Sequence, residues 1–543
     1  MKTVIIGGGA CGASCAARLR RLDEHAEIII LEATDEISIA NCGLPYYCSD
    51  VINSRENMIV AKPSLFKELF NIEVRFNSRV TSINPSSKTI VVNNDYELAY
   101  DNLVIAVGAS PFKPQIKGIE NNKKIFTVRT LSDADNIKLF IRQTGVKKAV
   151  VVGGGFIGVE MAENFIEMGL DTTLVEAAGQ ILSPVDSEIV CFAQNELREH
   201  GCKLILNKGV KAFDYSEIEL TSGEKIPYDI AILGIGVKPE TQIAKNAGIE
   251  VGVGDAIKVN EFMQTSVPDI WAGGDGVQVI DFVTGEPAII PLAGPANRQG
   301  RIIADNICGK KSVYKNSQGT SVIKVFNKTI ASTGENEKQL KRLGISYLKN
   351  IIMCNSHAGY YPDAKFMTIK ILFTSDGKIL GAQAAGYEGV EKRIDVIASI
   401  MRMNGTIQDL VDAELCYAPP YSSAKDPVNL LGMSCQNILD GLFKPAFYED
   451  LKDAYIIDVR PLSVYQISNI EGALSIPAAE IRERLNEIPF DKKVVLHCRR
   501  GYTSYVAARI LSGYGYENVY SLCGGKLLYD EISKNNENVP INV

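Results

Sequence analysis

The sequence lacks any uninterrupted apolar run of 18 or more residues, because Gly, Pro or a charged residue interrupts every candidate. A membrane-spanning helix is therefore not expected. Cysteine is also sparse: 12 residues in a chain of 543 are too few for a disulfide scaffold. The first residues have the pattern of a strand and not of a signal peptide. These absences predict a cytoplasmic protein with reduced thiols and no membrane partner.

An excess of positive charge is missing too. The 57 Lys and Arg residues face 64 Asp and Glu residues, which gives a formal net charge of -7. No global basic field exists to hold nucleic acid, and any basic site must be local. What the chain does have is length and a 46% hydrophobic content, enough for three or four domains with sizeable cores.

A short apolar strand, a glycine cluster and a small-residue helix occur twice, at residues 3–21 and 149–169. Glycine at the G-x-G-x-x-G positions lets the backbone approach a pyrophosphate at the N-terminus of the helix. The glycines at this spacing are Gly7, Gly9 and Gly12 in the first copy and Gly153, Gly155 and Gly158 in the second. The repeat predicts two nucleotide-binding units.

A glutamate ends the next strand in each copy. Glu32 follows Gly12 by 20 residues, and Glu176 occupies the matching place in the second copy. From this position a carboxylate accepts hydrogen bonds from ribose hydroxyls. Glu176 would repel a 2′-phosphate and no Arg follows it immediately, so NADH is preferred and NADPH is the alternative.

These motifs resemble the flavoprotein family with two dinucleotide-binding domains, and the resemblance covers residues 1 to about 440. It implies FAD in the first unit and a nicotinamide nucleotide in the second. Residues 265–275 are similar to the second FAD motif of that family, and the similarity gives Asp275 a contact with the flavin ribityl chain. No metal site is predicted.

The expected fold class is α/β, with two Rossmann-like dinucleotide-binding domains, an α+β dimerisation domain and a C-terminal α/β domain. The predicted boundaries are 1–120 with 245–320 for the FAD domain, 121–244 for the NAD(P)H domain, 321–440 for the interface domain and 446–543 for the C-terminal domain. The resemblance implies a homodimer formed through the interface domain.

Cys42, in the run 38–47, is the predicted electron acceptor of the flavin half. The dithiol reductases use C-x-x-x-x-C, but Tyr47 stands at the fifth place after Cys42 and Cys48 comes one place too late. The run resembles the single-cysteine branch of coenzyme A disulfide reductases, persulfide reductases, NADH oxidases and NADH peroxidases. In that branch one thiol forms a mixed disulfide, persulfide or sulfenic acid. The alternative is a buried cysteine that acts as a small hydrophobe.

The oxidases and peroxidases of this branch resemble one another in carrying a His where this chain has Ala10, which disfavours them. The His-Glu dyad of dithiol reductases is missing as well. Tyrosines in the runs 359–362 and 417–422 resemble segments of coenzyme A disulfide reductases that reach the partner subunit's active site. A phenol can donate a proton to a leaving thiolate. Tyr361 and Tyr421 are preferred over Tyr360 and Tyr417, and aromatic packing is the alternative.

Arg18 and Arg21 lie at the end of the first expected helix. By resemblance they would hold the phosphates of coenzyme A while its pantetheine arm runs to Cys42. The alternative is that both cations face solvent and oppose the helix dipole.

Residues 458–460, 469–477 and 494–503 form three motifs of the C-terminal domain. Together they resemble a single rhodanese domain, so the domain over 446–543 is expected to be an α/β rhodanese domain. A strand delivers Cys498 to a loop that opens into a helix over 504–512, so that loop amides converge on the sulfur. The loop residues assigned to the site are Arg499, Arg500, Gly501 and Thr503. Related phosphatases need Arg six places after the cysteine, where this chain has Ser504. Cys523 is a candidate resolving thiol, and an inert domain used only for contacts is the alternative.

The predicted activity is NADH-driven and FAD-dependent reduction of coenzyme A persulfide, polysulfide or coenzyme A disulfide through Cys42, with sulfane sulfur bound or supplied at Cys498. Two alternatives stay open. One is an NADH oxidase or peroxidase, and the other is a sulfur-transfer or carrier protein whose flavin half only reports redox state.

Overall fold

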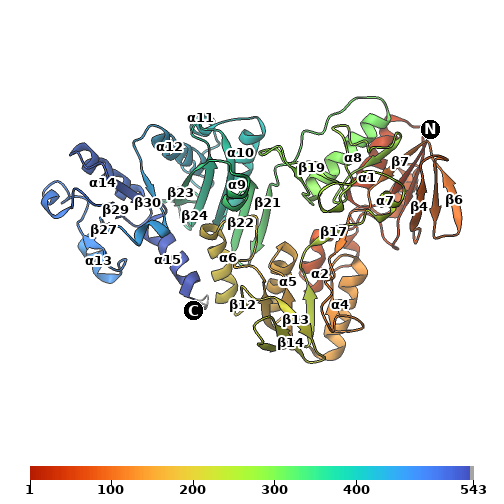
Figure 1. The fold of residues 1–543 in the computed structure, drawn as a ribbon, viewed down its shortest axis with the longest axis horizontal. Coiled ribbons are helices and arrows are strands. Elements are labelled where there is room, and N and C mark those ends of the chain that lie inside the picture. The colour runs from red at the N-terminus through yellow and green to blue at the C-terminus, as the bar shows by residue number, and fades with distance from the viewer. Residues whose placement is uncertain (538–543) are drawn as a thin grey trace. The chain divides into compact units, whose positions relative to one another are not determined.

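The computed structural model describes residues 1–537 and divides into two compact units. Unit 1 contains residues 1–179 and 207–319, and unit 2 contains residues 180–206 and those from 320 onward (Figure 1). None of the helices described is long and apolar enough to cross a membrane.

The first sheet of unit 1 has five parallel strands in the order β18-β7-β1-β2-β3. Its strands are β1 (Lys2–Ile6), β2 (Glu27–Leu31), β3 (Glu73–Arg75), β7 (Asn102–Ile105) and β18 (Ile270–Ala272). The accompanying helices are α1 (Ala10–Leu22), α2 (Leu44–Cys48), α3 (Pro63–Glu68), α7 (Gln242–Asn246) and α8 (Ala293–Ile307), with 3-10 turns η1 (Asn41–Gly43), η2 (Glu56–Met58) and η3 (Val253–Asp255). Gly300 of α8 lets this helix approach α1 closely, because a Cβ at Gly300 would lie 2.2 Å from the Cys11 carbonyl oxygen.

The second nucleotide domain of unit 1 repeats this plan with parallel strands in the order β11-β10-β16-β9. These are β9 (Ile125–Phe126), β10 (Lys148–Val152), β11 (Asp171–Val175) and β16 (Ile230–Leu233), with helices α4 (Leu131–Thr144) and α5 (Phe156–Glu167). Small antiparallel sheets complete unit 1: β4 (Val80–Asn84), β5 (Thr89–Val92) and β6 (Tyr96–Ala99); β13 (Val210–Phe213), β14 (Glu217–Leu220) and β15 (Lys225–Pro227); β8 (Ala109–Pro111) with β17 (Val237–Pro239); and β19 (Val279–Ile280) with β20 (Pro287–Ala288).

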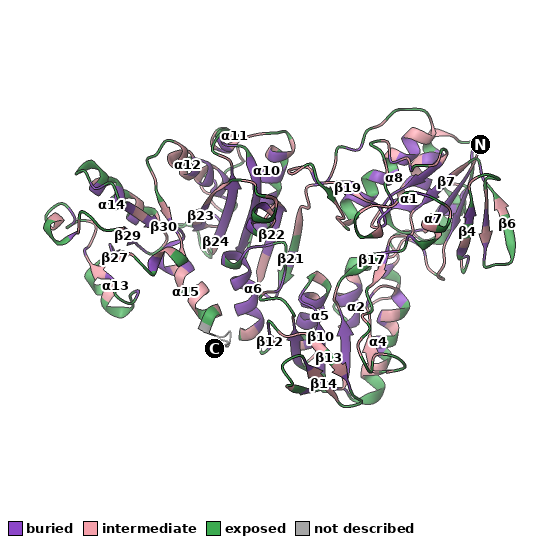
Figure 2. Ribbon diagram, viewed as in Figure 1, coloured by how far each residue is buried: buried purple, intermediate pink, exposed green. Residues whose placement is uncertain are grey.

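Unit 2 contains an antiparallel sheet of order β21-β22-β25-β24-β23. Its strands are β21 (Ser321–Val325), β22 (Lys328–Gly334), β23 (Leu348–Asn355), β24 (Phe366–Phe373) and β25 (Ile379–Gly386). Helices α6 (Ser187–Glu199), α9 (Glu337–Leu343), α10 (Val390–Arg402), α11 (Ile407–Asp412) and α12 (Pro427–Leu439), with the short strand β12 (Lys203–Ile205), belong to the same part. Helix α6 is coloured almost entirely as buried in Figure 2, because its faces pack on neighbouring elements of unit 2.

The last part of unit 2 is a five-stranded parallel sheet of order β26-β30-β29-β27-β28. Its elements are β26 (Pro445–Ala446), η4 (Tyr448–Leu451), β27 (Tyr455–Asp458), α13 (Leu462–Ile467), β28 (Leu474–Ser475), η5 (Leu485–Glu487), β29 (Val494–His497), α14 (Tyr502–Gly513), β30 (Val519–Leu522) and α15 (Gly525–Glu537). Helix α14 begins two residues before the predicted start, because Gly501 adopts a φ of 104° and turns the chain into the helix.

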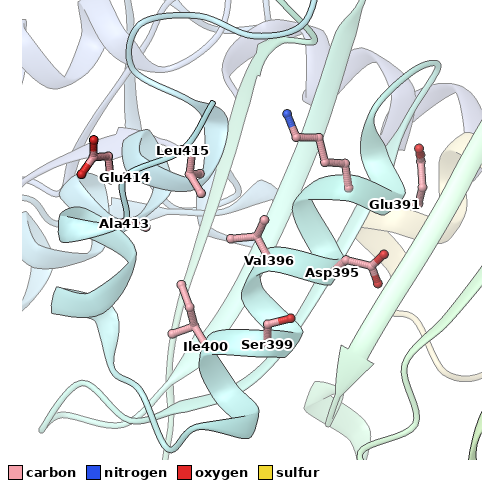
Figure 3. Close-up of a pocket in the computed structure, with 9 residues that line it drawn as sticks. Glu391, Asp395, Val396, Ser399, Ile400, Ala413, Glu414 and Leu415 are labelled. Atoms are coloured by element: carbon pink, nitrogen blue, oxygen red, sulfur yellow. The ribbon is translucent and has the colours of Figure 1, made fainter. Parts of the chain in front are cut away.

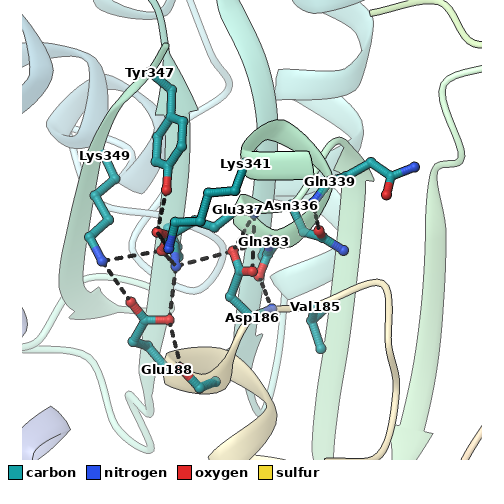
Figure 4. Close-up of polar contacts among 12 residues, drawn as sticks. Val185, Asp186, Glu188, Asn336, Glu337, Gln339, Lys341, Tyr347, Lys349 and Gln383 are labelled. Carbon is teal, nitrogen blue, oxygen red and sulfur yellow. Dashed lines mark hydrogen bonds and ion pairs between the residues drawn. The ribbon is translucent and has the colours of Figure 1, made fainter. Parts of the chain in front are cut away.

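A buried ionic cluster joins α6 to the antiparallel sheet (Figure 4). Lys370, which has no exposed side-chain area, pairs with Asp186, Glu188 and Glu337, and Lys349 pairs with two of the same carboxylates. Burial opposes ionisation, but the Lys370 ammonium holds the pKa of Glu337 well below its usual range. Removing one partner would leave a buried charge unpaired, so the cluster fixes α6 on the sheet.

The C-terminal helix α15 packs on α6 as well. The amide of Asn195 donates to the carbonyl and the carboxylate of Glu531 at 2.9 Å, and Arg198 donates to Asn535 at 2.8 Å. Residues 180–206 therefore pack with the last two parts of the chain in unit 2. The domain boundaries drawn from the sequence stay a prediction.

Candidate functional site

The first glycine turn connects β1 to α1 and leaves space in front of the helix. A Cβ on Gly12 would lie 2.0 Å from the Gly7 carbonyl oxygen, whereas a Cβ on Gly9 would meet nothing within 4 Å. No side chain caps α1. Glycine is therefore required for close packing at Gly12 and leaves an open, amide-lined surface at Gly9. That combination fits a pyrophosphate at the helix N-terminus.

The second turn has the same construction. A Cβ on Gly158 would lie only 1.9 Å from the Gly153 carbonyl oxygen. A Cβ on Gly155 would have its nearest neighbour, the Gly234 carbonyl oxygen, at 3.9 Å. Each turn is braced by its glutamate. Glu32 accepts the Gly8 N–H at 2.9 Å, and Glu176 accepts the Gly154 N–H at 2.6 Å. Both carboxylates are thus oriented by the backbone before any ribose is bound.

Asp275 follows β18 at the end of the first sheet. The preceding Gly274, with a φ of 82°, donates its N–H to Gln299 at 2.7 Å. Burial raises the pKa of Asp275, while Arg129 partly opposes the rise. A partly buried carboxyl at this edge suits hydrogen bonding to a polyhydroxyl chain, which is the predicted ribityl contact.

Cys42 lies on η1, and its thiol is exposed. Partial burial, followed by the carboxylates of Glu160 and Asp275, raises its pKa. Cys48 lies at the end of α2 and is buried, and burial raises the pKa of its thiol to about 12. Cys42 is therefore the accessible thiol of this segment.

Glu160 is a site residue that the sequence analysis missed. It lies on α5, and the Tyr46 hydroxyl donates to its carboxylate at 3.4 Å. Burial raises the pKa of Glu160 to about 7. Glu160 comes two places after Gly158, and no motif spacing connects it to the cysteine segment, because Tyr46 and Glu160 are 114 residues apart in the chain. Only the folded chain brings this carboxyl to the cysteine segment.

The two tyrosine runs lie side by side in unit 2. The Tyr360 and Tyr417 hydroxyls share a hydrogen bond of 2.7 Å, and the Ala358 N–H donates to the Ser422 carbonyl at 3.0 Å. Tyr421 is 72% exposed, and Tyr361 is 43% exposed, with its ring edge-to-face against the buried His357 at 5.7 Å between centroids. The exposure argues against a purely packing role within the described unit.

A single buried arginine, Arg393 on α10, connects the two runs. Its guanidinium donates to the Ser356 carbonyl at 3.0 Å and to the Tyr421 carbonyl at 3.3 Å, and it pairs with Asp426 at 3.0 Å. No sequence pattern predicts this role, because a basic residue within an amphipathic helix is usually solvated.

Arg18 and Arg21 differ in how accessible their guanidinium groups are to a phosphate. Arg18 pairs with Asp305 on α8 at 2.8 Å, so a phosphate would compete with this carboxylate. Arg21 is exposed, and its guanidinium lies 6.0 Å from the centre of the Phe70 ring. Arg20, between them, is buried and donates to the Phe70 and Asn71 carbonyls.

In the parallel sheet of unit 2, β29 delivers Cys498 to the turn before α14. The sulfur is buried, with 5% of the residue exposed, and accepts the Gly501 N–H at 3.2 Å and the Ser504 hydroxyl at 3.5 Å. No side chain caps α14. Arg499 and Thr503 are exposed, and Arg500 is half-buried. Amides and the helix N-terminus thus face a sulfur that they would stabilise as an anion.

Cys523 is buried, and burial raises its pKa to about 12. Its thiol donates to the Asn350 side chain on β23 at 3.6 Å. Asn350 also contacts Cys435 at 3.5 Å. A resolving role at Cys498 requires this thiol to leave Asn350, and it stays a prediction.

A further depression of about 580 Å³ opens on unit 2 between α10 and the segment after α11 (Figure 3). Its lining includes Glu391, Lys392, Asp395 and Glu414. None of the residues predicted for catalysis or cofactor binding lines it.

Two α/β domains with nucleotide-binding turns, an accessible cysteine and a second cysteine under loop amides define a nucleotide-dependent oxidoreductase with an added sulfur-handling domain. The description "Pyridine nucleotide-disulphide oxidoreductase" matches residues 1–300, the dimerisation domain of the same family matches residues 320–427, and the rhodanese-like domain matches residues 445–530. The chain belongs to the pyridine nucleotide-disulphide oxidoreductase family. The predicted family and α/β fold class are confirmed, and membership implies FAD and a nicotinamide nucleotide.

Known proteins resemble the chain along most of its length. The crystal structure of reduced Bacillus anthracis CoADR-RHD has a TM-score of 0.96 and 46% identity, covering 98% of each chain. A NAD-dependent persulfide reductase from A. fulgidus has a TM-score of 0.93 and 37% identity, covering 97% of this chain and 100% of that one. The coenzyme A disulfide reductase of Staphylococcus epidermidis is 34% identical over 443 residues, covering 80% of this chain and 100% of that protein.

Proposed function

We propose that this protein uses NADH to reduce the sulfur-sulfur bond of coenzyme A persulfide, polysulfide or coenzyme A disulfide. The observation that carries the proposal is the exposure of Cys42, whereas Cys48 in the same segment is buried. The names of the Bacillus anthracis and A. fulgidus proteins and of the Staphylococcus epidermidis protein support the class of substrate.

The glycine turns would hold the cofactors. Gly7, Gly9, Gly12, Glu32 and Asp275 would bind FAD. The second set, Gly153, Gly155, Gly158 and Glu176, would bind NADH in preference to NADPH, because the Glu176 carboxylate repels a 2′-phosphate. When bound, FAD would accept a hydride from the nicotinamide ring and return two electrons to the sulfur held on Cys42.

Cys42 performs the first bond exchange. Its thiolate attacks one sulfur of the substrate, a bond forms between that sulfur and Cys42, and the other sulfur leaves as a thiolate or hydrosulfide. Tyr361 or Tyr421 of the partner subunit in a homodimer donates the proton to that leaving group. Glu160 takes the proton of the Cys42 thiol, because its raised pKa of about 7 makes it a base near neutral pH.

Arg21 and Arg18 bind the phosphates of coenzyme A, with Arg18 exchanging Asp305 for phosphate. The Cys498 thiolate attacks the terminal sulfur of a polysulfide, and a persulfide forms on Cys498 as the shortened polysulfide leaves. The Gly501 amide and the α14 N-terminus stabilise that persulfide. The coenzyme A thiolate then attacks its outer sulfur and releases the Cys498 thiolate, and the resulting coenzyme A persulfide carries the sulfur to Cys42.

The test is anaerobic NADH consumption with coenzyme A persulfide, polysulfide and coenzyme A disulfide in turn. Cys42→Ser should abolish turnover of all three, and the matched control Cys48→Ser should not. Cys498→Ser should lower polysulfide turnover alone. If no sulfur substrate drives NADH oxidation while admitting oxygen does, the proposal fails and an NADH oxidase replaces it.

A further inference from the structure

The loop that carries Cys498 is held by the antiparallel sheet of unit 2. Arg500 donates to the Asn355 side-chain oxygen at 2.9 Å. The guanidinium groups of Arg499 and Arg500 lie 5.3 and 5.1 Å from the centre of the Phe366 ring. Asn355 and Phe366 are directly opposite one another in the register of β23 and β24, so they form a two-residue platform at one end of that sheet.

The opposite side of the loop is held by the start of α15. The Lys526 N–H donates to the Cys498 carbonyl at 2.9 Å, and the Leu527 N–H donates to the Arg499 carbonyl at 3.1 Å. Gly525 packs so closely that a Cβ there would lie 2.7 Å from the Cys498 carbonyl oxygen. The backbone of the loop is thus fixed on one side by its own domain, while its two arginine side chains are fixed by the sheet.

The contacts of Arg500 with the sheet affect the Cys498 sulfur through the next residue, Gly501. Gly501, whose N–H points at the Cys498 sulfur at 3.2 Å, directly follows Arg500. Gly501 has a φ of 104°. Because glycine can adopt many backbone conformations, neighbouring contacts are needed to hold it in this one. A guanidinium anchored at Asn355 and stacked on Phe366 limits the motion of the adjoining peptide.

We propose that Asn355 and Phe366 are positioning residues for sulfur transfer at Cys498. The platform keeps the Gly501 amide aimed at the sulfur, so the rhodanese site is completed by a part of the chain outside the rhodanese domain. The guanidinium groups of Arg499 and Arg500 serve this docking in addition to attracting an anionic sulfur donor. The inference rests on the proposed activity of Cys498.

The platform is not the sole attachment of the domain. Lys349 pairs with Glu449 at 3.2 Å, and α15 is bonded to α6 through Asn195 and Arg198. Loss of Asn355 or Phe366 should therefore leave the domain folded and docked, which makes the role of the platform measurable.

The experiment uses the full-length holoenzyme and measures sulfur transfer from thiosulfate to cyanide, with coenzyme A disulfide reduction measured in parallel. Phe366→Leu and Asn355→Ala should lower the kcat of sulfur transfer roughly tenfold with little change in KM for thiosulfate, because the amide geometry and not the donor affinity is disturbed. Asn355→Asp should restore the rate, since a carboxylate still accepts from Arg500. Coenzyme A disulfide reduction should stay at the wild-type rate in all three variants.

Glu449→Gln is the matched control, since it removes the ion pair with Lys349, which lies near the opposite end of β23 from Asn355. The inference is overturned if Phe366→Leu and Asn355→Ala transfer sulfur at the wild-type rate, or if Glu449→Gln lowers kcat equally. If wild type and Cys498→Ser transfer sulfur at the same rate, it is the proposed activity of Cys498 that fails.

Discussion

The half-buried Glu160 and the buried His497 are ionisable residues whose pKa values shift in opposite directions. Burial keeps Glu160 protonated up to about pH 7 and keeps His497 neutral down to about pH 4. Both directions follow from the same cause, because desolvation penalises whichever form carries charge. The consequences for stability therefore have opposite signs.

Glu160→Gln should reduce the pH dependence of the free energy of unfolding of unit 1. The native pKa of about 7 lies above the ordinary value of 4.5, so the native state binds more protons and the free energy of unfolding falls as pH rises between these values. Because the side chain is half-buried, we expect a loss of about 1 kcal/mol between pH 5 and 7 in wild type and less in the variant. Urea unfolding followed by Trp271 fluorescence measures this, and equal slopes would contradict it.

His497→Met should remove an acid sensitivity of the rhodanese domain. The pKa of His497 is lowered to about 4 by burial, partly opposed by Asp458, so protonation favours unfolding as pH falls from about 6.5 toward 4. Wild type should lose about 2 kcal/mol between pH 7 and 5. Pulsed alkylation of the buried Cys523 along a urea gradient reports opening of this domain. The prediction is wrong if His497→Met loses as much stability as wild type.

The sequence was informative at the residue scale where chemistry depends on local spacing. Gly7, Gly12 and Glu32 could be placed because a strand, a turn and a helix impose that spacing on any dinucleotide site. Glu160 and Asn355 could not, because each acts on a segment more than 100 residues away in the chain. Nothing in their neighbours marks them, and only tertiary packing does.

At the scale of elements, helix α10 holds the two exposed tyrosine loops next to each other. The runs around Tyr361 and Tyr421 were recognised separately, but their adjacency depends on α10, which presents Arg393 to both. The predicted rhodanese helix was likewise right in place and two residues short, because the start of α14 is set by the backbone at Gly501. Side-chain patterns locate a helix better than they locate its first turn.

Arg393→Lys should slow thiol release without affecting cofactor use. A lysine keeps the charge beside Asp426 but cannot donate to both loops at once. We expect kcat for coenzyme A disulfide reduction to fall about tenfold with KM for NADH unchanged. Steady-state kinetics of the holoenzyme measures both quantities.

Lys392→Met, on the adjacent and less buried position of α10, is the control and should behave as wild type. Unchanged kcat in Arg393→Lys, or an equal rise in KM for NADH, would show that the arginine does not position the tyrosines.

At the scale of the whole molecule, the rhodanese domain is a docked part of unit 2 and not a module on a tether. It contacts β23 through Lys349 and Asn355, β24 through Phe366, and α6 through Asn195. The motifs predict the domain over 446–543, but they do not predict these contacts. Docking depends on single residues spread over three elements, which leave no pattern along the chain.

Asn195→Ala should loosen this docking. The substitution removes two hydrogen bonds from α6 to Glu531, and local opening of α15 should become several-fold more frequent. Limited proteolysis of the holoenzyme measures the rate of cleavage near residues 440–446. Asn536→Ala, at an exposed position on the same helix, is the control. Equal cleavage rates in Asn195→Ala and wild type would refute the expectation.

The placement of α6 has a consequence for how such proteins can be recombined. By chain order the helix lies within the nicotinamide-binding region, yet by contact it belongs with the interface sheet and α15. A chimera that exchanged only the residues after 445 would pair α15 with a foreign helix and the two loop arginines with a foreign sheet end. A working exchange would have to include α6 and the Asn355–Phe366 platform as well. A single crossover point in the gene therefore cannot transfer the rhodanese domain together with the residues that it packs on.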